Sequence, residues 1–245
     1  MRAHKSLLVR PAMMRRYAPV LALTWSTLVF SAPATAAAQQ TDLQAWSLLT
    51  ANIALTDDTR WSLYLEAQAR LGDDASRLER LLLRPAVGRQ LTRTVVAFVG
   101  YAWTPTFTNT SYETDFRSEH RIWQQLVVRH GGSRLTWQHR IRQEQRMIAE
   151  TSGMSHRTRY LVRASYASAP GRRSGVTGYH ELFVTWNSVE RGPRAGYDRS
   201  RLFVGPYATR GRVRYEAGYV GEYGRRFGNR DRIINALLVS ANLTF

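Results

Sequence analysis

Arginine and glutamate side chains recur at alternate positions through much of this sequence, and they are the residues best suited to bind charged groups. Between positions 138 and 146, for example, Arg140, Arg142 and Glu144 are separated by single residues. A period of two is typical of a β-strand and places these side chains on one face. The set expected on such polar faces comprises Arg80, Arg84, Glu119, Arg121, Arg140, Arg142, Glu144, Arg157, Arg159, Arg163, Glu181, Arg201, Arg214 and Glu216.

The chemistry of these side chains depends on where their faces point. Lys5 is the only lysine, so every cationic residue after it is arginine, which pairs bidentately with carboxylates and phosphates and keeps its proton. In a barrel with its polar faces inward, two interpretations remain. Arginines and glutamates pair across neighbouring strands and fill the lumen, or surplus arginine leaves a wet pore that attracts anions. The size of the ring favours the filled lumen, and both interpretations stay open.

A catalytic site would need a nucleophile or an acid–base pair within reach. His120 follows Glu119, but neighbouring residues of a strand point to opposite faces, so these two cannot cooperate. Ser165 and Ser200 lie in no Gly-x-Ser-x-Gly stretch, and no His-Glu-x-x-His stretch is present. The absence of cysteine excludes thiolate metal sites and disulfides. We therefore predict no catalytic residue, no metal and no cofactor, with a lipid-modifying enzyme of the lipid A hydrolase type as the alternative.

The first 38 residues have the pattern of an export signal. Arg15 and Arg16 precede a mostly apolar run over residues 17–30, and an alanine-rich Ala-x-Ala stretch follows. This order is typical of a secretory signal peptide, with cleavage expected after Ala38. We expect residues 39–245 to form a single β-barrel domain in the outer membrane of a Gram-negative cell.

The charge of the chain restricts its partners. The formal net charge is +17, from 35 basic and 18 acidic side chains. Nucleic acid is one partner of such basic chains, but these arginines recur at period two throughout instead of forming one patch, and the chain is predicted to be exported. We exclude nucleic acid and expect arginines in the loops to meet the phosphates of outer-membrane lipid and lipopolysaccharide.

The elements that must position the arginines are strands. In residues 60–71, Trp61, Leu63 and Leu65 alternate with polar residues, and eleven segments of this kind follow one another between residues 42 and 245. No apolar run after the signal reaches the roughly 18 residues of a membrane-spanning helix. The predicted fold is all-β, an antiparallel up-and-down transmembrane β-barrel. Because single-chain bacterial barrels have even strand numbers, we expect twelve strands, within a range of ten to twelve.

Short and long connections between these strands alternate along the chain. Short turns on one side and longer loops on the other are typical of outer-membrane barrels. The short turns are predicted at 56–59, 92–93, 131–132 and 210–211, and long polar loops at 105–116, 148–155, 187–197 and 224–230.

Aromatic residues support a membrane position. Trp61 and Trp137 begin strands just after short turns, whereas Trp103 and Trp186 end strands just before long loops. Two levels of tryptophan are typical of the aromatic girdles at the two membrane interfaces. The last strand ends on Phe245, which we also expect at an interface. We expect that strand to be the segment that the barrel-assembly machinery binds.

Six short segments are spread over nearly the whole exported chain: 42–46 (DLQAW), 119–125 (EHRIWQQ), 140–146 (RIRQEQR), 181–184 (ELFV), 199–205 (RSRLFVG) and 217–220 (AGYV). Together these segments resemble one bacterial family of exported proteins, the domain of unknown function 2490 family. The resemblance implies a meandering outer-membrane-type barrel, and it implies no catalytic residues because the family has no assigned activity.

The sequence therefore predicts an outer-membrane β-barrel that is a small passive, anion-preferring channel or a structural protein with an Arg/Glu-lined lumen. The alternatives are the lipid-modifying enzyme and a soluble periplasmic barrel that binds an acidic ligand. One arrangement would contradict the membrane interpretation: Leu63, Leu65, Val162 and Leu237 meeting in a dry centre, with the arginines outside in solvent.

Overall fold

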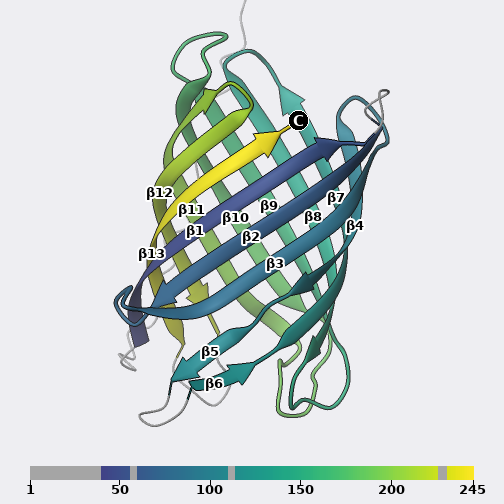
Figure 1. The fold of residues 1–245 in the computed structure, drawn as a ribbon, viewed down its shortest axis with the longest axis vertical. Helices are drawn as coiled ribbons and strands as arrows, with labels where there is room; N and C mark the ends of the chain where they lie inside the picture. The colour runs from purple at the N-terminus through teal and green to yellow at the C-terminus, as the bar shows by residue number, and fades with distance from the viewer. Residues whose placement is uncertain (1–39, 56–59, 110–113, 226–230) are drawn as a thin grey trace, which may run out of the picture. The chain divides into compact units, whose positions relative to one another are not determined.

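The computed structural model describes residues 40–55, 60–109, 114–225 and 231–245. The predicted signal peptide, its cleavage after Ala38 and the turn at 56–59 lie outside the described residues. The described chain is built of strands (Figure 1), and within it no helix is long and apolar enough to cross a membrane. The strands are β1 (Gln40–Ala54), β2 (Trp61–Gly72), β3 (Arg77–Gln90), β4 (Val95–Trp103), β5 (Thr106–Asn109), β6 (Thr114–Arg117), β7 (Glu119–Gly131), β8 (Leu135–Ile148), β9 (Ser155–Ala167), β10 (Ser174–Thr185), β11 (Gly196–Arg210), β12 (Val213–Gly224) and β13 (Arg232–Thr244).

Eleven of these strands, β1–β4 and β7–β13, close into a ring in which each strand pairs with the next along the chain. All the pairs are antiparallel except the closing one, in which β1 runs parallel to β13 from Gln40↔Arg232 to Asn52↔Thr244. In an odd-numbered meander the first and last strands run in the same direction, so they can only pair in parallel. The twelve strands expected from the even-number rule are not found; the count of eleven that the alternation itself indicated matches the ring.

Strands β5 and β6 form a hairpin outside the ring. Residues 106–109 of β5 pair with residues 114–117 of β6, and Thr106 pairs with Arg80 of β3. The prediction of one long polar loop over 105–116 was therefore wrong. Strands of four residues are too short to show a clear alternation of polar and apolar side chains, so the sequence pattern does not reveal them.

The connections sort to the two ends of the ring. The short-turn end carries the connections 91–94, 132–134, 168–173 and 211–212, and the long-loop end carries the β5–β6 hairpin and the loops 149–154 and 186–195. The four-residue connection 73–76 is also at the long-loop end. Gly211 in the tight turn between β11 and β12 has φ of 56°, a left-handed conformation that glycine adopts without strain.

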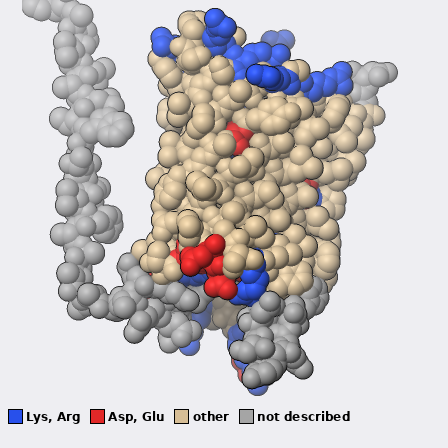
Figure 2. All heavy atoms as spheres, turned by 60° about the vertical axis from the view of Figure 1, so that its left-hand side comes forward, with Lys and Arg blue, Asp and Glu red and all other residues tan. Residues whose placement is uncertain are grey.

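The barrel wall is apolar outside and polar inside. Leu237 is 64% exposed on the outer face, where Leu65 and Val239 are also exposed, whereas Arg142 on the inner face is 1% exposed. Figure 2 shows a broad surface that is mostly uncharged, with most of the charged groups gathered at the two ends. Leu65 and Leu237 therefore do not meet in a dry centre, and the arrangement that would contradict the membrane interpretation is absent from the described residues.

Two small apolar clusters lie on the inner face. One is centred on Phe203 and Leu238, and the other packs Trp123 against Ala86 and Ala102. Trp123 fits because Gly100 lies beneath it: a Cβ atom at Gly100 would lie 2.7 Å from the indole and 2.5 Å from the Ala86 Cβ. These clusters leave most of the lumen to polar side chains.

Candidate functional site

The lumen contains one large cavity of about 1030 Å³, here called the main chamber. It reaches from Thr94 and Gly131 at the short-turn end to Glu119 and Arg199 near the long-loop end. Fifteen arginines and four glutamates line it. The arginines are Arg60, Arg70, Arg80, Arg84, Arg121, Arg129, Arg140, Arg142, Arg146, Arg157, Arg159, Arg163, Arg199, Arg201 and Arg214, and the glutamates are Glu66, Glu119, Glu181 and Glu216.

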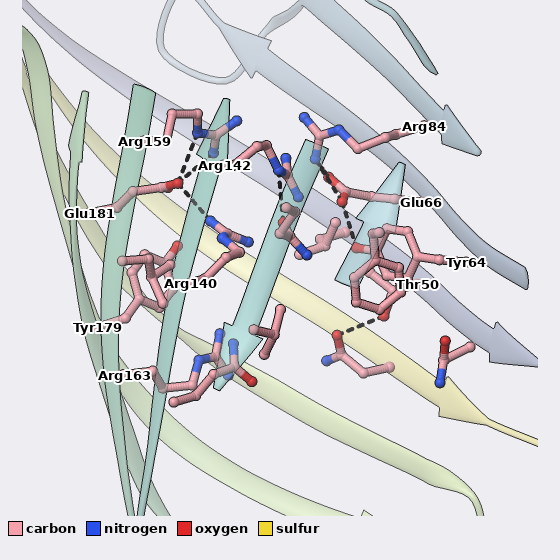
Figure 3. A pocket seen from close by; sticks show the side chains of 18 of the residues that line it. Thr50, Tyr64, Glu66, Arg84, Arg140, Arg142, Arg159, Arg163, Tyr179 and Glu181 are labelled. Atoms are coloured by element: carbon pink, nitrogen blue, oxygen red, sulfur yellow. Dashed lines mark hydrogen bonds and ion pairs between the residues drawn. The ribbon is translucent and has the colours of Figure 1, made fainter. Parts of the chain in front are cut away.

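Glu144 and Glu181 are the central acceptors of the lumen. Glu144 is 0% exposed and lies 2.6 Å from Arg157 and 3.0 Å from Arg159. Glu181 lies 2.7 Å from Arg159 and 2.6 Å from Arg140 (Figure 3). Glu144 thus bridges two guanidinium groups of the neighbouring β9, and Glu181 bridges one from β9 and one from β8.

The bridges continue into a closed cycle of alternating charges across β8 to β11 and β12. Its five remaining links are Arg201 to Glu181 (3.6 Å), Arg201 to Glu222, Arg199 to Glu222 (3.0 Å), Arg199 to Asp198 (3.2 Å) and Arg157 to Asp198 (2.9 Å). In order, the cycle runs Arg157, Glu144, Arg159, Glu181, Arg201, Glu222, Arg199, Asp198 and back to Arg157. Burial of these charges is tolerable because each has partners of opposite sign on both sides.

Other glutamates also serve two donors each. Glu119 lies 2.7 Å from Arg121 and 2.6 Å from Arg146. Glu66 lies 2.7 Å from Arg84 and accepts a hydrogen bond from the Tyr64 hydroxyl at 2.7 Å.

Glu216 binds Arg163 at 2.6 Å and Arg214 at 2.7 Å. The carboxylates of the lumen are therefore already occupied, and the remaining donor capacity belongs to arginine.

Among the residues that the structure describes, no carboxylate is bonded to Arg142. Its Nε donates to the Gln125 Oε1 at 2.8 Å, and its guanidinium lies 4.5 Å from the centroid of the Trp123 ring. Both terminal nitrogens are buried without a hydrogen-bond partner. Arg142 lies beside Arg140 and opposite Arg84 in Figure 3, so the middle of the lumen carries positive charge that the glutamates do not neutralise.

Three further lumen arginines bond only neutral groups. Arg70 donates from Nε and Nη2 to the Gln68 Oε1 at 3.3 and 3.0 Å. Arg80 donates to the Thr106 hydroxyl at 3.2 Å. At the opposite end Arg129 donates to a glutamine, Gln138 Oε1, at 3.1 Å. Arginines without a direct carboxylate bond to a described residue are therefore present at both ends of the main chamber.

The short-turn end has a basic rim. No aspartate or glutamate among the described residues is exposed there, whereas the long-loop end exposes acids such as Asp73 and Glu150 beside its arginines. Figure 2 shows the basic groups along the upper edge and acidic groups near the lower edge. The exposed arginines of the basic rim are Arg60, Arg89, Arg93, Arg129, Arg134, Arg172, Arg173, Arg210 and Arg212.

The comparisons with known proteins agree on one family. A family model described as "Protein of unknown function (DUF2490)" matches residues 43–233. The chain belongs to this family. An uncharacterised protein of Methylorubrum extorquens is 32% identical over 166 residues, which cover 66% of this chain and 71% of the relative. No solved structure matches the chain. The predicted resemblance is confirmed, and because the DUF2490 family has no known function, any function must be argued from the geometry.

In this DUF2490 barrel, thirteen of the fourteen predicted lumen residues line the main chamber. The fourteenth, Glu144, is fully buried behind Arg157 and Arg159. The prediction missed further members of the same inner faces. These are Arg70, Arg129, Arg146 and Arg199, with the ring-bearing residues Trp46, Trp123, Tyr179 and Phe183. The alternation pattern could have identified them, because each is separated by an even number of positions from a predicted lumen residue or from another polar residue of the same strand.

The five predicted interface aromatics lie near the two ends of the barrel. Trp61 and Trp137 are exposed at the short-turn end, together with Phe245. Trp103 is the last residue of β4, and Trp186 directly follows β10 at the long-loop end, where it is exposed. Their role at membrane interfaces stays a prediction.

The outer face carries a hydrogen-bonded group around His120 that the sequence pattern did not predict. Ser118 Oγ and His120 Nε2 are 3.1 Å apart, and His120 Nδ1 is hydrogen-bonded to the Tyr101 hydroxyl. Trp103 Nε1 donates to Ser118 Oγ at 2.9 Å. Glu119 points into the lumen instead, as the strand geometry predicts. Over the described ranges no three His, Cys, Asp or Glu side chains are grouped so that they could hold a metal ion.

Proposed function

We propose that this protein is an outer-membrane β-barrel that lets small anions pass passively through its lumen. The observation that carries the proposal is the inverted wall, apolar outside and arginine-rich inside. A barrel in water hides its apolar faces in a core, whereas a barrel in lipid turns them toward the acyl chains. Exposed apolar areas of this extent on a soluble protein would be an aggregation hazard.

The strand dimensions support the membrane position. The ring strands run from 9 residues in β4 to 15 residues in β1 and β11. About 9–11 tilted residues cross a bilayer, so the remaining residues extend into the interfaces. Within the described residues, closure of the ring gives each of its eleven strands a partner on both sides, as a barrel in lipid requires.

Arginine–aromatic pairs support an interface at the short-turn end. Arg89 lies 5.1 Å from the Trp61 ring centroid, and Arg212 lies 5.7 Å from the Phe245 ring centroid. Such pairs combine an apolar ring at the edge of the acyl region with a cation that reaches the headgroup phosphates.

In the orientation usual for outer-membrane barrels, short turns lie in the periplasm. Phe245 would then be at the periplasmic side, where the barrel-assembly machinery acts on the last strand. The long-loop end, with exposed arginines such as Arg191, would face lipopolysaccharide phosphates.

The charge distribution supports anion preference. The basic rim raises the local concentration of anions at the mouth of the main chamber. Inside, fifteen arginines meet four glutamates on the chamber wall. Because each glutamate is already bonded to arginine or tyrosine groups, a cation finds no free carboxylate, whereas an anion finds free guanidinium donors.

A planar bilayer tests this proposal. Purified folded protein should give small single-channel currents, and the reversal potential under a KCl gradient should indicate selectivity for chloride. Protein unfolded by boiling is the control. Folded, inserted protein that gives no current, or that selects potassium, contradicts the anion-channel proposal.

A second candidate is a lipid hydrolase, and the Ser118–His120–Tyr101 cluster favours it. A hydroxyl within hydrogen-bond reach of an oriented imidazole is the arrangement of an activated nucleophile, and this one lies on the outer wall near the level of Trp103. No carboxylate among the described residues contacts His120, which makes this candidate the weaker one. Mass spectrometry of membrane lipids should show deacylated species on overexpression that disappear with Ser118→Ala; unchanged lipids would remove this candidate.

A further inference from the structure

Three arginines separate two cavities of the lumen. Beyond the main chamber, toward the long-loop end, lies a smaller cavity of about 100 Å³, here called the lower cavity. Arg70, Arg80 and Arg199 line both cavities. These three residues, here called the arginine partition, form the part of the wall that the two cavities share.

Two members of the partition form no direct ion pair with a carboxylate among the described residues. Arg199 is compensated by Asp198 at 3.2 Å and Glu222 at 3.0 Å. Arg70 and Arg80 lie directly opposite each other in the β2–β3 register, and they bond only Gln68 and Thr106. Like charges at directly opposed positions repel, and the repulsion is stronger out of bulk water.

The guanidinium of Arg70 is held in place. The side chain is 9% exposed, and its guanidinium carbon lies 3.8 Å from the centroid of the Trp46 ring. The indole of Trp46 is itself fixed, because its Nε1 donates to the Gln44 Oε1 at 2.6 Å. Stacking on an aromatic face leaves the edge of a guanidinium free to donate hydrogen bonds in its own plane.

The position of Arg80 is set by the β5–β6 hairpin. Thr106, the first residue of β5, accepts the hydrogen bond from Arg80 Nε at 3.2 Å. The terminal nitrogens of Arg80 have no carboxylate partner, and the nearest acid of its own strand, Glu79, is bonded to Arg232 at 3.0 Å. The hairpin outside the ring therefore orients a cation inside it.

We infer that Arg70 and Arg80 form a binding site for a small anion of the oxyanion or carboxylate class. Two preorganised guanidinium groups with spare donors match the bidentate geometry of phosphate and carboxylate oxygens. A bound anion removes the repulsion between the two cations and supplies the partner that both lack. The role of this site as the selective step of a pore rests on the proposed function; the binding itself does not.

Binding of inorganic phosphate to the full-length folded protein in nanodiscs tests the site. Calorimetric titration at constant ionic strength, with chloride as the balancing anion, should show saturable binding to the unaltered protein. The double variant Arg70→Gln plus Arg80→Gln should bind at least about tenfold more weakly, since charged hydrogen bonds of this kind contribute that much or more. The matched control is Arg191→Gln, which removes an exposed arginine that lines neither cavity and should bind within about twofold of the unaltered protein.

Absence of saturable phosphate binding to the unaltered protein, or an equal loss in the Arg191→Gln control, overturns the site. Folding of the variants is checked by heat-modifiable gel mobility. If the double variant does not fold, Arg80→Gln alone is used for the test, because among the described residues the change removes one direct hydrogen bond, to Thr106. Phosphate binding without bilayer conductance keeps the site and removes the pore. Conductance without phosphate binding keeps the pore and overturns the site.

Discussion

Replacing Leu237 by arginine tests whether lipid or water surrounds the barrel. Leu237 is 64% exposed and is the sixth of the thirteen residues of β13, so it lies near the middle of the outer wall. An arginine facing lipid at the bilayer midplane costs about 2–4 kcal/mol. The same change on a water-exposed surface costs within about 0.5 kcal/mol, because no buried contact is lost.

The assay is reversible urea unfolding of the barrel in phospholipid vesicles, followed by tryptophan fluorescence. Leu237→Arg should lower the free energy of unfolding by about 2–4 kcal/mol, which is roughly a 30- to 1000-fold change in the folding equilibrium. The matched control is Leu91→Arg, in the short turn after β3, where the leucine is 53% exposed. Near the membrane interface that substitution should cost about 0–1 kcal/mol.

The reasoning is refuted if the two arginine variants have the same stability and both lie within about 0.5 kcal/mol of the unaltered protein. The exposed apolar faces would then meet water, and the soluble periplasmic barrel would replace the membrane barrel. Recovery of the unaltered protein in the soluble periplasmic fraction would point to the same conclusion.

Two further predictions concern the interior. Glu144→Gln leaves Arg157 and Arg159 without their shared carboxylate and should lower the free energy of unfolding, measured by the same urea assay, by about 3–5 kcal/mol. The exposed control Glu150→Gln should change this free energy by less than about 0.5 kcal/mol. Equal effects of the two substitutions would show that the cycle of charges does not contribute to folding stability. Gly100→Ala places a Cβ atom 2.5 Å from the Cβ atom of Ala86 on β3. The overpacking should lower the free energy of unfolding by about 1–3 kcal/mol. An unchanged or increased stability in urea would show that the wall is less tightly packed at this position.

The sequence by itself determined which side chains share a face. Alternation is a local property, because successive residues of a strand point to opposite sides whatever the strand pairs with. That is why Arg140, Arg142 and Glu144 could be assigned to the inner wall, and why eleven strands could be counted. The expectation of twelve strands came from the even-number rule for single-chain barrels, and not from the alternation, which indicated eleven.

Other features of the fold depend on how neighbouring strands are aligned with each other, and the alternation within one strand does not specify this alignment. The parallel closure of β1 on β13 and the short β5–β6 hairpin follow from the geometry of the whole ring. The pairing of Glu144 with Arg157 and Arg159, and the cycle through Glu181 and Asp198, require five strands to be aligned at once. A shift of two residues in one register would keep every face and change every partner.

The division of the lumen was decided in the same way. Nothing in the sequence distinguishes Arg70 and Arg80 from the arginines that have carboxylate partners, since all recur at the same period on similar strands. Only the tertiary structure places them opposite each other, with neutral partners, between two cavities. Local spacing fixes the direction of a side chain, whereas the long-range closure of the ring determines which charges it meets.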